Sequence, residues 1–130
     1  MLSFAYTILY VDDVEETLTF YEKAFGFKRK FKTPEGDYGE IMSGETTLAF
    51  ASHELGASNF KAAYQKSNLD SPFGFELAFT TLDVKAAYET ALAHGAIAVE
   101  AVVQKPWGQE VGYVKDLNGF LIELCTPISS

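Results

Sequence analysis

The chain has 130 residues, a length typical of one compact domain, and its single cysteine, Cys125, excludes an internal disulfide and is typical of a reducing, cytoplasmic compartment. Ten lysines and arginines against 18 aspartates and glutamates give a net charge of −8, which argues against nucleic-acid binding, because that function needs a basic patch. No apolar run approaches the roughly 18 residues of a membrane span, so we expect neither a nucleic acid nor a membrane as a partner.

The first half of the chain is expected to form one strand, one helix and three further strands. An apolar run at 3–11 predicts a strand covered on both faces. Asp12 and Asp13 end the run, and one of their carboxylates can cap the helix that follows. Gly26 ends that helix, which is indicated by apolar residues at helical spacing, namely Val14, Leu18, Tyr21 and Phe25. The three strands are expected at 27–33, 38–43 and 46–51.

Residues 52–72 differ in composition from the stretches on either side. They mix polar, small and glycine residues and show no sustained period. We interpret them as the connection between a first module, 1–51, and a second module, 73–130, of a single domain. One helical turn is expected at Phe60–Gln65. A lid, a dimer contact and a plain surface linker all fit a connection of this length.

The second half repeats the order of the first. A strand at 73–81 precedes a helix at 83–94, which ends at His94 and Gly95. Further strands are expected at 97–104, 109–115 and 119–126. The Asn-Gly pair in residues 116–119 favours a tight hairpin turn between the last two of these strands.

An internal repeat therefore organises the chain. Residues 6–25 and 76–95 both run from an apolar strand through an acidic turn into an amphipathic helix. A repeat of about 70 residues is too long for a solenoid and indicates a duplicated supersecondary unit, here βαβββ. A fold made of two such units has its natural pocket between them.

Four stretches carry a resemblance to a known family. They are ILYVDD at 8–13, TFYEKAFGF at 19–27, PWGQ at 106–109 and GYVKDLNGFLIEL at 112–124. With these motifs the chain resembles the vicinal oxygen chelate superfamily, which groups glyoxalase I, bleomycin-resistance proteins, fosfomycin-resistance enzymes and extradiol dioxygenases. The resemblance implies an α+β fold in which two βαβββ modules form a cup-shaped mixed sheet with the helices outside. It also implies a homodimer, because proteins of this family usually complete or enclose their clefts by pairing.

The resemblance places the metal ligands of glyoxalase I at Tyr6, Ala49, Glu76 and Glu123. Strand alternation separately turns Glu76 and Glu123 away from the expected helix side, so both carboxylates point into one concave surface. Ala49 cannot ligate a metal, and a phenol with a pKa near ~10 is a poor ligand at neutral pH. A catalytic metal site ordinarily has three protein ligands. The implied metal site is therefore weak and incomplete, with Glu76 and Glu123 alone. No cofactor is expected, and a divalent metal stays an alternative.

Aromatic residues supply the other binding candidates. Trp107 lies in a Pro-Trp-Gly turn that resembles the turn lining the ligand groove of bleomycin-resistance proteins. A tryptophan can stack on a cation or a planar ring, and packing of Trp107 against the sheet edge fits equally well. An aromatic wall can be supplied by Tyr6, Tyr10, Tyr38 and Tyr113, with Phe4 and Phe31.

The remaining titratable groups leave several roles open. The Glu76–Glu123 pair can act as general acid and base, bind a cation, pair with Arg29 or a lysine, or accept hydrogen bonds from Tyr6 and water. His94 is expected at a helix end, and His53 is expected to be solvated or to serve as a substitute metal ligand. Cys125 is expected to be a buried, inert thiol, because no histidine is placed to activate it.

Two functions remain. The first is metal-free binding of a small aromatic or cationic molecule, of the bleomycin-resistance type, in a cavity lined by Tyr6, Glu76, Trp107, Tyr113 and Glu123. The acidic charge and the incomplete ligand set favour it. The alternative is a divalent-metal-dependent lyase, isomerase or dioxygenase of the glyoxalase type that uses Glu76 and Glu123. Glu123 favours this alternative, because bleomycin-resistance proteins tend to have an apolar residue at that position. The identity of the ligand does not follow from the sequence.

Overall fold

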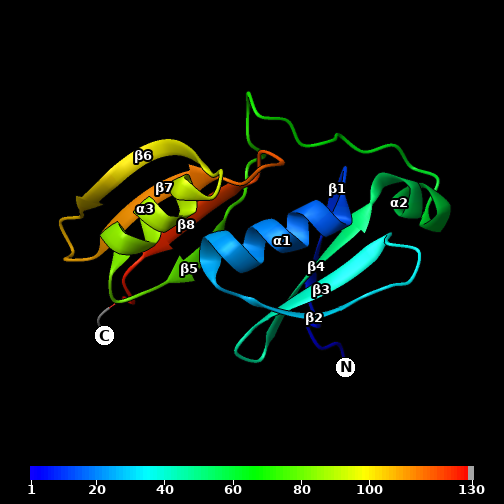
Figure 1. Cartoon of the computed structure of the whole chain (residues 1–130), viewed down its shortest axis with the longest axis horizontal. Coiled ribbons are helices and arrows are strands. Elements are labelled where there is room, and N and C mark those ends of the chain that lie inside the picture. Colours follow the sequence, from blue (N-terminus) through cyan, green and yellow to red (C-terminus); the bar gives the residue numbers. More distant parts are fainter. Residues whose placement is uncertain (129–130) are drawn as a thin grey trace. The chain divides into compact units, whose positions relative to one another are not determined.

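The protein, described by a computed structural model over residues 1–128, consists of two compact units, each built on one mixed sheet (Figure 1). The first unit is Met1–Lys66 and the second begins at Ser67. Each unit has a four-stranded sheet, and the described residues form three helices. The expected α+β fold of two repeated modules is therefore confirmed. That the two sheets together line a cup stays a prediction.

The first unit has the order strand, helix, three strands, helix. Its elements are β1 (Thr7–Val11), α1 (Val14–Phe25), β2 (Lys28–Lys32), β3 (Tyr38–Ser43), β4 (Thr46–Ser52) and α2 (His53–Asn59). The strands lie in the order β1-β4-β3-β2. β1 is parallel to β4, and the other neighbours are antiparallel.

The second unit repeats this topology. Its elements are β5 (Leu77–Thr80), α3 (Val84–Ala93), β6 (Ile97–Gln104), β7 (Glu110–Lys115) and β8 (Leu121–Cys125). The strands lie in the order β5-β8-β7-β6, with β5 parallel to β8 and the other neighbours antiparallel. Each strand of the second sheet therefore has a counterpart in the first, as the repeat predicts.

The helices begin and end where the capping residues predict. The side chain of Asp13 accepts a hydrogen bond from the backbone N–H of Glu16 at 2.9 Å, which satisfies a free donor in the first turn of α1. Gly26 ends α1 in the left-handed conformation, with φ of 76°. Asp83 caps α3 in the same way, through the N–H of Ala86 at 3.1 Å. Of the two candidate caps of α1, Asp13 is the one used.

Each sheet buries one face against its helix. α1 packs on β2, β3 and β4, whereas α3 packs on β6, β7 and β8. The largest fully buried side chains in the first unit are Leu18, Tyr21, Ile41 and Phe50, and those in the second are Val84, Val114 and Ile122. Burying one such side chain contributes roughly 1.5–3 kcal/mol. The residues on the opposite face of each sheet are therefore free to carry polar chemistry.

The first predicted strand is shorter and less covered than expected. β1 begins at Thr7 rather than at residue 3, and Phe4 is 89% exposed. Leu9 and Val11 are buried while Ile8 is 37% exposed, so β1 shows the alternation of a strand with one face covered in its own unit. β1 is also an edge strand, with β4 as its neighbour.

The predicted strand at 73–81 is reduced to β5. β5 pairs only with the part of β8 from Ile122 to Cys125. The backbone N–H of Phe75 instead donates to the carbonyl of Phe73 at 2.8 Å. A hydrogen bond between residues two apart closes a tight turn and takes the backbone out of strand geometry. Glu76 therefore lies just before β5 and not within it.

The connection between the modules contains a helix that the sequence pattern did not indicate. α2 begins after Ser52, whose hydroxyl accepts a hydrogen bond from the N–H of Leu55 at 3.1 Å. α2 packs on β4 and β1 and belongs to the first unit. The helical turn expected at Phe60–Gln65 is wrong, because Phe60 caps α2 in an extended conformation. Seven residues without a sustained apolar period are too few to show a helix in the sequence.

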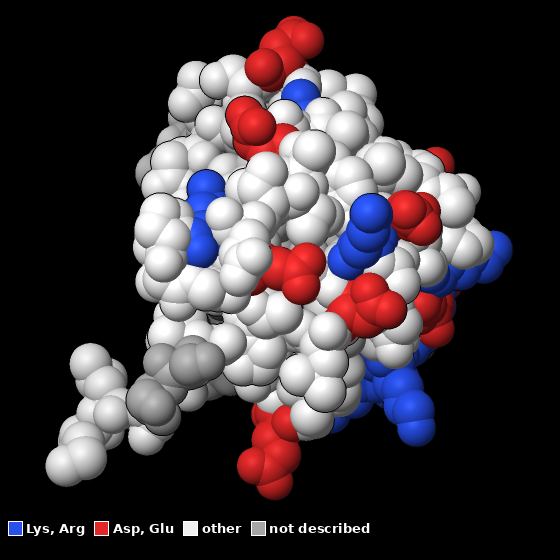
Figure 2. Space-filling view, turned by 90° about the vertical axis from the view of Figure 1, so that its left-hand side faces the viewer, with Lys and Arg blue, Asp and Glu red and all other residues white. Residues whose placement is uncertain are grey.

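Charged side chains are distributed without a continuous patch on the face shown in Figure 2. There, acidic and basic side chains are interspersed and separated by uncharged surface. None of the helices in residues 1–128 is long and apolar enough to cross a membrane.

Candidate functional site

Two glutamates and a tyrosine meet on the face of the second sheet that α3 does not cover. Glu123 lies on β8 between Ala78 of β5 and Tyr113 of β7. Its neighbours Ile122 and Leu124 are buried, so strand alternation turns Glu123 to the other face. The hydroxyl of Tyr113 donates a hydrogen bond to Glu123 Oε1 at 3.0 Å. Glu76 is close enough to share a hydrogen bond with Glu123. Strand alternation therefore holds for Glu123, whereas Glu76 reaches it from the turn before β5.

The two adjacent carboxyl groups disfavour each other's ionised form. Burial, followed by the charge of Glu123 and a hydrogen bond to it, raises the pKa of Glu76. Burial also raises the pKa of Tyr113 to about 12, with the hydrogen bond and charge of Glu123 acting in the same direction. Tyr113 is thus a neutral donor at physiological pH. A proton on Glu76 relieves the repulsion between the carboxylates, and a bound cation could take its place.

Raising the pH is expected to remove stability that the proton on Glu76 provides. Because the pKa of Glu76 is raised above its unfolded value of 4.5, the native state holds more protons than the unfolded chain above that pH. The free energy of unfolding should therefore fall as the pH rises through the native pKa. Urea unfolding at a series of pH values should show this fall in the wild type. Glu76→Gln should flatten it, and Glu110→Gln, an exposed change on β7, should not. The same profile in the wild type and in Glu76→Gln would contradict the assignment.

Cys125 lies next to this pair as an unreactive thiol. It is 3% exposed, and its Sγ lies 3.8 Å from the carbonyl oxygen of Phe79. Burial raises the pKa of Cys125 to about 11, and the hydrogen bond and charge of Glu123 act in the same direction. The thiolate, which is the nucleophilic form, is therefore disfavoured. This agrees with the prediction of a buried, inert thiol.

Trp107 lies in a separate hollow of the second unit. Its Nε1–H donates to Gln109 Oε1 at 2.8 Å, and Gln109 Nε2 donates to the carbonyl of Thr126 at 2.8 Å. The indole is 64% exposed. The hollow has a volume of about 550 Å³ and is lined by Leu82, Trp107, Gly108, Gln109, Thr126, Pro127 and Ile128. The lining does not include the two glutamates or Tyr113, so a cavity shared by Trp107 and the carboxylates stays a prediction.

The first sheet carries a second carboxylate–phenol set, in which Glu40 had no predicted role. Glu40 lies on β3, is 7% exposed and accepts a hydrogen bond from the hydroxyl of Tyr38 at 2.6 Å. Lys30 Nζ lies 3.6 Å from Glu40 Oε1. Burial raises the pKa of Tyr38, followed by the hydrogen bond and charge of Glu40 and by contact with Tyr6. Tyr6, which the resemblance singled out, is 44% exposed and joins this set.

The repeat relates the two sets. Ile8 and Ala49 lie beside Glu40 in the first sheet, just as Ala78 and Glu123 lie beside Tyr113 in the second sheet. The corresponding sites are therefore Tyr6 and Glu76, Ala49 and Glu123, and Glu40 and Tyr113. Where the first unit has the phenol Tyr6 and the carboxylate Glu40, the second unit has the carboxylate Glu76 and the phenol Tyr113. At the third position the first unit has Ala49, which carries no polar group, in place of Glu123. Glu40 could have been found from the sequence as the one charged residue within the predicted strand 38–43.

Arg29 has acidic partners within its own unit. Its guanidinium donates to Glu15 at 2.8 Å and to Glu22 at 2.8 Å, and both carboxylates lie on α1. Arg29, followed by Lys32, holds the pKa of Glu15 well below its usual range. Within residues 67–128 of the second unit, no ion pair joins a basic side chain to Glu76 or Glu123. Pairing of the glutamates with Arg29 stays an untested alternative.

The two histidines take structural positions. His94 caps the C-terminus of α3, with its backbone N–H directed at the carbonyls of Thr90 and Ala91. His53 is 16% exposed rather than solvated, with Nε2 3.0 Å from Asp12 Oδ1 and Nδ1 2.6 Å from the hydroxyl of Tyr64. Both ring nitrogens of His53 are thus occupied, so the alternative of a substitute metal ligand does not fit.

The donor set does not fit the metal of glyoxalase I. In the described part of the chain, no group of three or more His, Cys, Asp and Glu side chains could hold a metal ion. The second sheet offers Glu76, Glu123 and a phenol whose pKa is raised to about 12. Borderline metals such as zinc and nickel favour imidazole and carboxylate ligands, three of them from the protein in a catalytic site. Two carboxylates and a neutral phenol do not meet this requirement.

Comparisons with known proteins agree on one family. The family model of the Glyoxalase/Bleomycin resistance protein/Dioxygenase superfamily matches residues 3–124. No curated protein matches the chain. Among solved structures, a glyoxalase-related enzyme from Fulvimarina pelagi is similar with a TM-score of 0.84 and 21% identity, over 98% of this chain and 89% of that one.

Two further solved structures belong to proteins named after the same superfamily. One, from Burkholderia phytofirmans PsJN, has a TM-score of 0.76 and 18% identity over 94% of this chain and 96% of that one. The other, from Sphaerobacter thermophilus DSM 20745, has a TM-score of 0.74 and 22% identity over 98% and 99% of the two chains. At this level of identity the structures show a shared fold.

Proposed function

Because the chain belongs to the Glyoxalase/Bleomycin resistance protein/Dioxygenase superfamily, we propose that it binds a small cationic molecule with a planar or aromatic body, without a metal. The observation that carries the proposal is the adjacent Glu76–Glu123 pair, which no basic side chain of residues 67–128 neutralises. Glu76 is exposed and Glu123 is half-buried, and each of two adjacent carboxylates makes the charge of the other less favourable. A cationic ligand supplies the missing partner.

The pair also explains how a cation would be distinguished from a neutral molecule. Without ligand, a proton on Glu76 reduces the repulsion from Glu123, which is one cause of the raised pKa of Glu76. A cation that displaces this proton gains two carboxylates. Tyr113 holds Glu123 in place through the 3.0 Å hydrogen bond and stays neutral. At pH values below the native pKa of Glu76, binding of a cation is therefore coupled to the release of a proton.

A matched pair of probes tests the proposal. N-methylquinolinium carries a fixed positive charge, and quinoline has nearly the same shape without that charge at about pH 8. Isothermal titration calorimetry should show tighter binding of N-methylquinolinium by about tenfold or more, the effect of one charge-assisted contact. Equal affinities for the two probes would overturn the proposal.

The fluorescence of Trp107, the only tryptophan in the chain, offers a second reading. Quenching by N-methylquinolinium would show that the aromatic turn lies beside the bound probe, as expected if Trp107 and the glutamates share a cavity. Binding without quenching would support the glutamate pair and contradict a role for Trp107.

The alternative function is a metal-dependent enzyme of the glyoxalase type. Glu123 favours it, since the resemblance places a metal ligand of glyoxalase I at this position. Metal analysis of freshly purified protein without an affinity tag separates the two functions. Stoichiometric zinc, nickel, manganese or iron, lost together with turnover in Glu76→Gln/Glu123→Gln, would replace the binding proposal with this one.

We also propose that the protein pairs as a homodimer. β1 is an edge strand whose residue Ile8 is exposed, and the segment before it exposes Leu2 and Phe4. A second copy would cover this apolar surface. Light scattering at roughly tens of micromolar, within the range where specific pairs associate, should give the mass of two chains. A monomer mass would contradict the pairing.

A further inference from the structure

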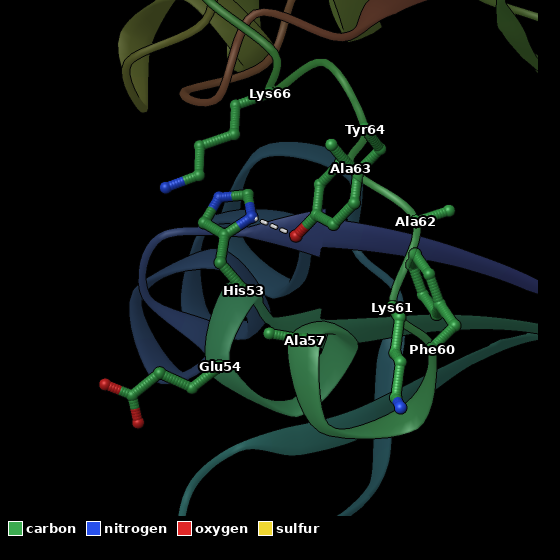
Figure 3. A pocket seen from close by; sticks show the side chains of 9 residues that line it. All are labelled: His53, Glu54, Ala57, Phe60, Lys61, Ala62, Ala63, Tyr64 and Lys66. Carbon is green, nitrogen blue, oxygen red and sulfur yellow. Dashed lines mark hydrogen bonds between the residues drawn. The ribbon is translucent and has the colours of Figure 1, made fainter.

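A hollow in the first unit, remote in sequence from Glu76 and Glu123, has the composition of a small-molecule site. It has a volume of about 540 Å³, within the usual range of ligand pockets. α2 and the residues that follow it form its wall (Figure 3). The lining residues are His53, Glu54, Ala57, Phe60, Lys61, Ala62, Ala63, Tyr64 and Lys66.

Aromatic rings give the hollow a planar apolar wall. The centroid of Tyr64 lies 5.0 Å from that of Tyr10 and 5.8 Å from that of Phe60. His53 stacks on Tyr64 at 5.7 Å with an interplanar angle of 29°. Rings at these separations stabilise each other and favour a further planar group. The alanines on the same wall leave room for one.

A chain of hydrogen bonds fixes the protons on this wall. His53 Nε2 lies 3.0 Å from Asp12 Oδ1, and an ionised carboxylate can only accept, so Nε2 carries the hydrogen. His53 Nδ1 then accepts from the hydroxyl of Tyr64 at 2.6 Å (Figure 3). Burial, followed by the nearby Tyr10, raises the pKa of Tyr64, so the phenol keeps its proton. Asp12, His53 and Tyr64 therefore form one ordered relay.

The lysines of the hollow lack acidic partners. No ion pair in the described residues involves Lys61 or Lys66. Glu54 is the one acidic residue among those that line the hollow, and in Figure 3 its carboxylate points away from the ring of His53. The side chain of Lys66 lies on the side of His53 in the same view. The whole chain has a net charge of −8, whereas the side chains that line this hollow include two lysines and one glutamate and are net positive.

We propose that this hollow is a second binding site, which takes a small planar aromatic carboxylate. The aromatic body packs against Phe60 and Tyr64, and the carboxylate lies between Lys66 and the relay. The site differs from the proposed cation site in its residues and in the sign of its ligand. A failure of the cation-site proposal would therefore not affect the proposal of this second site, and the reverse also holds.

Titration of the ¹⁵N-labelled full chain with 2-naphthoate tests the site, with the uncharged 2-naphthamide as the matched control. Shift changes should concentrate in residues 53–66. 2-Naphthoate should bind more tightly than 2-naphthamide. Lys66→Gln should weaken its binding about two- to fivefold, the effect of one partly exposed charge. Lys85→Gln, an exposed change on α3, should leave the affinity unchanged.

A variant of the aromatic wall provides a further control. Tyr64→Phe keeps the ring and removes the hydroxyl, so the uncharged 2-naphthamide should bind to it as it binds to the wild type. Equal affinities for the acid and the amide, shift changes outside residues 53–66, or full affinity in Lys66→Gln would each overturn the proposal.

Discussion

Removing both negative charges, as Glu76→Gln/Glu123→Gln, is expected to weaken binding of N-methylquinolinium about ten- to a hundredfold. The loss of one charge-assisted contact costs on the order of 1.5–3 kcal/mol. Glutamine keeps the size and most of the hydrogen-bonding capacity of glutamate, so the change isolates charge. Tyr113 can still donate its 3.0 Å hydrogen bond to the amide oxygen at residue 123. Calorimetry at about pH 8 measures the effect.

Two comparisons show whether this loss comes from the site. Glu110→Gln removes one exposed charge from β7 of the same sheet, so it controls for the general field of an acidic protein and should change the affinity little. Full affinity in the double variant would remove the basis of the proposed function. Binding of 2-naphthoate to the first unit should be unaffected.

Gly119→Ala is expected to lower the free energy of unfolding by more than about 2 kcal/mol. Gly119 has a φ of 94°, and a Cβ there would lie 1.9 Å from the backbone oxygen of Asn68. Strain at a positive φ costs about 1–3 kcal/mol, and the clash adds to it because a backbone atom has to move. Asn68 is itself held in a turn, with Oδ1 accepting from the N–H groups of Asp70 and Ser71. Urea unfolding measures the loss.

The chain provides a matched control for this substitution. Gly108 has the same φ of 94°, but a Cβ there meets nothing within 4 Å. Gly108→Ala therefore carries the backbone strain without the clash, and the difference between the two variants isolates the contact with Asn68. That contact holds the segment after Ser67 against the β7–β8 turn, where Lys115 Nζ also donates to the carbonyl of Leu69. Equal losses in the two variants would show that the contact contributes nothing.

Much of the fold could be predicted because its signals are local. Asp13 and Asp83 cap helices through residues three positions ahead. The turn at 116–119 closes through the N–H of Gly119 and the carbonyl of Asp116 at 3.1 Å. Such contacts lie within a few residues, so the sequence pattern contains both partners. The internal repeat also helped, because the second half of the chain shows the same sequence of strands and helix as the first.

The candidate site was predictable in part for the same reason. Strand alternation is a local rule, and it placed Glu123 on the face opposite the helix. It did not show that the hydroxyl of Tyr113 reaches Glu123, since the partner strand is set by the register of β7 and β8. Nor did it show that Glu40 is buried beside Tyr38, because the covering groups come from elsewhere in the first unit.

The sequence by itself determined the repeated βαβββ order, the helix caps, the hairpin turn and the face on which Glu123 lies, because each depends on residues that are near in the chain or alternate along it. Only the tertiary structure decided which groups became partners. Arg29 joins Glu15 across 14 residues, His53 joins Asp12 to Tyr64, and the first strand keeps one face exposed. These contacts depend on strand register and on the seven-residue helix α2, whose stability comes from packing on β1 and β4 rather than from its own composition. The sequence pattern contains no signal for such packing.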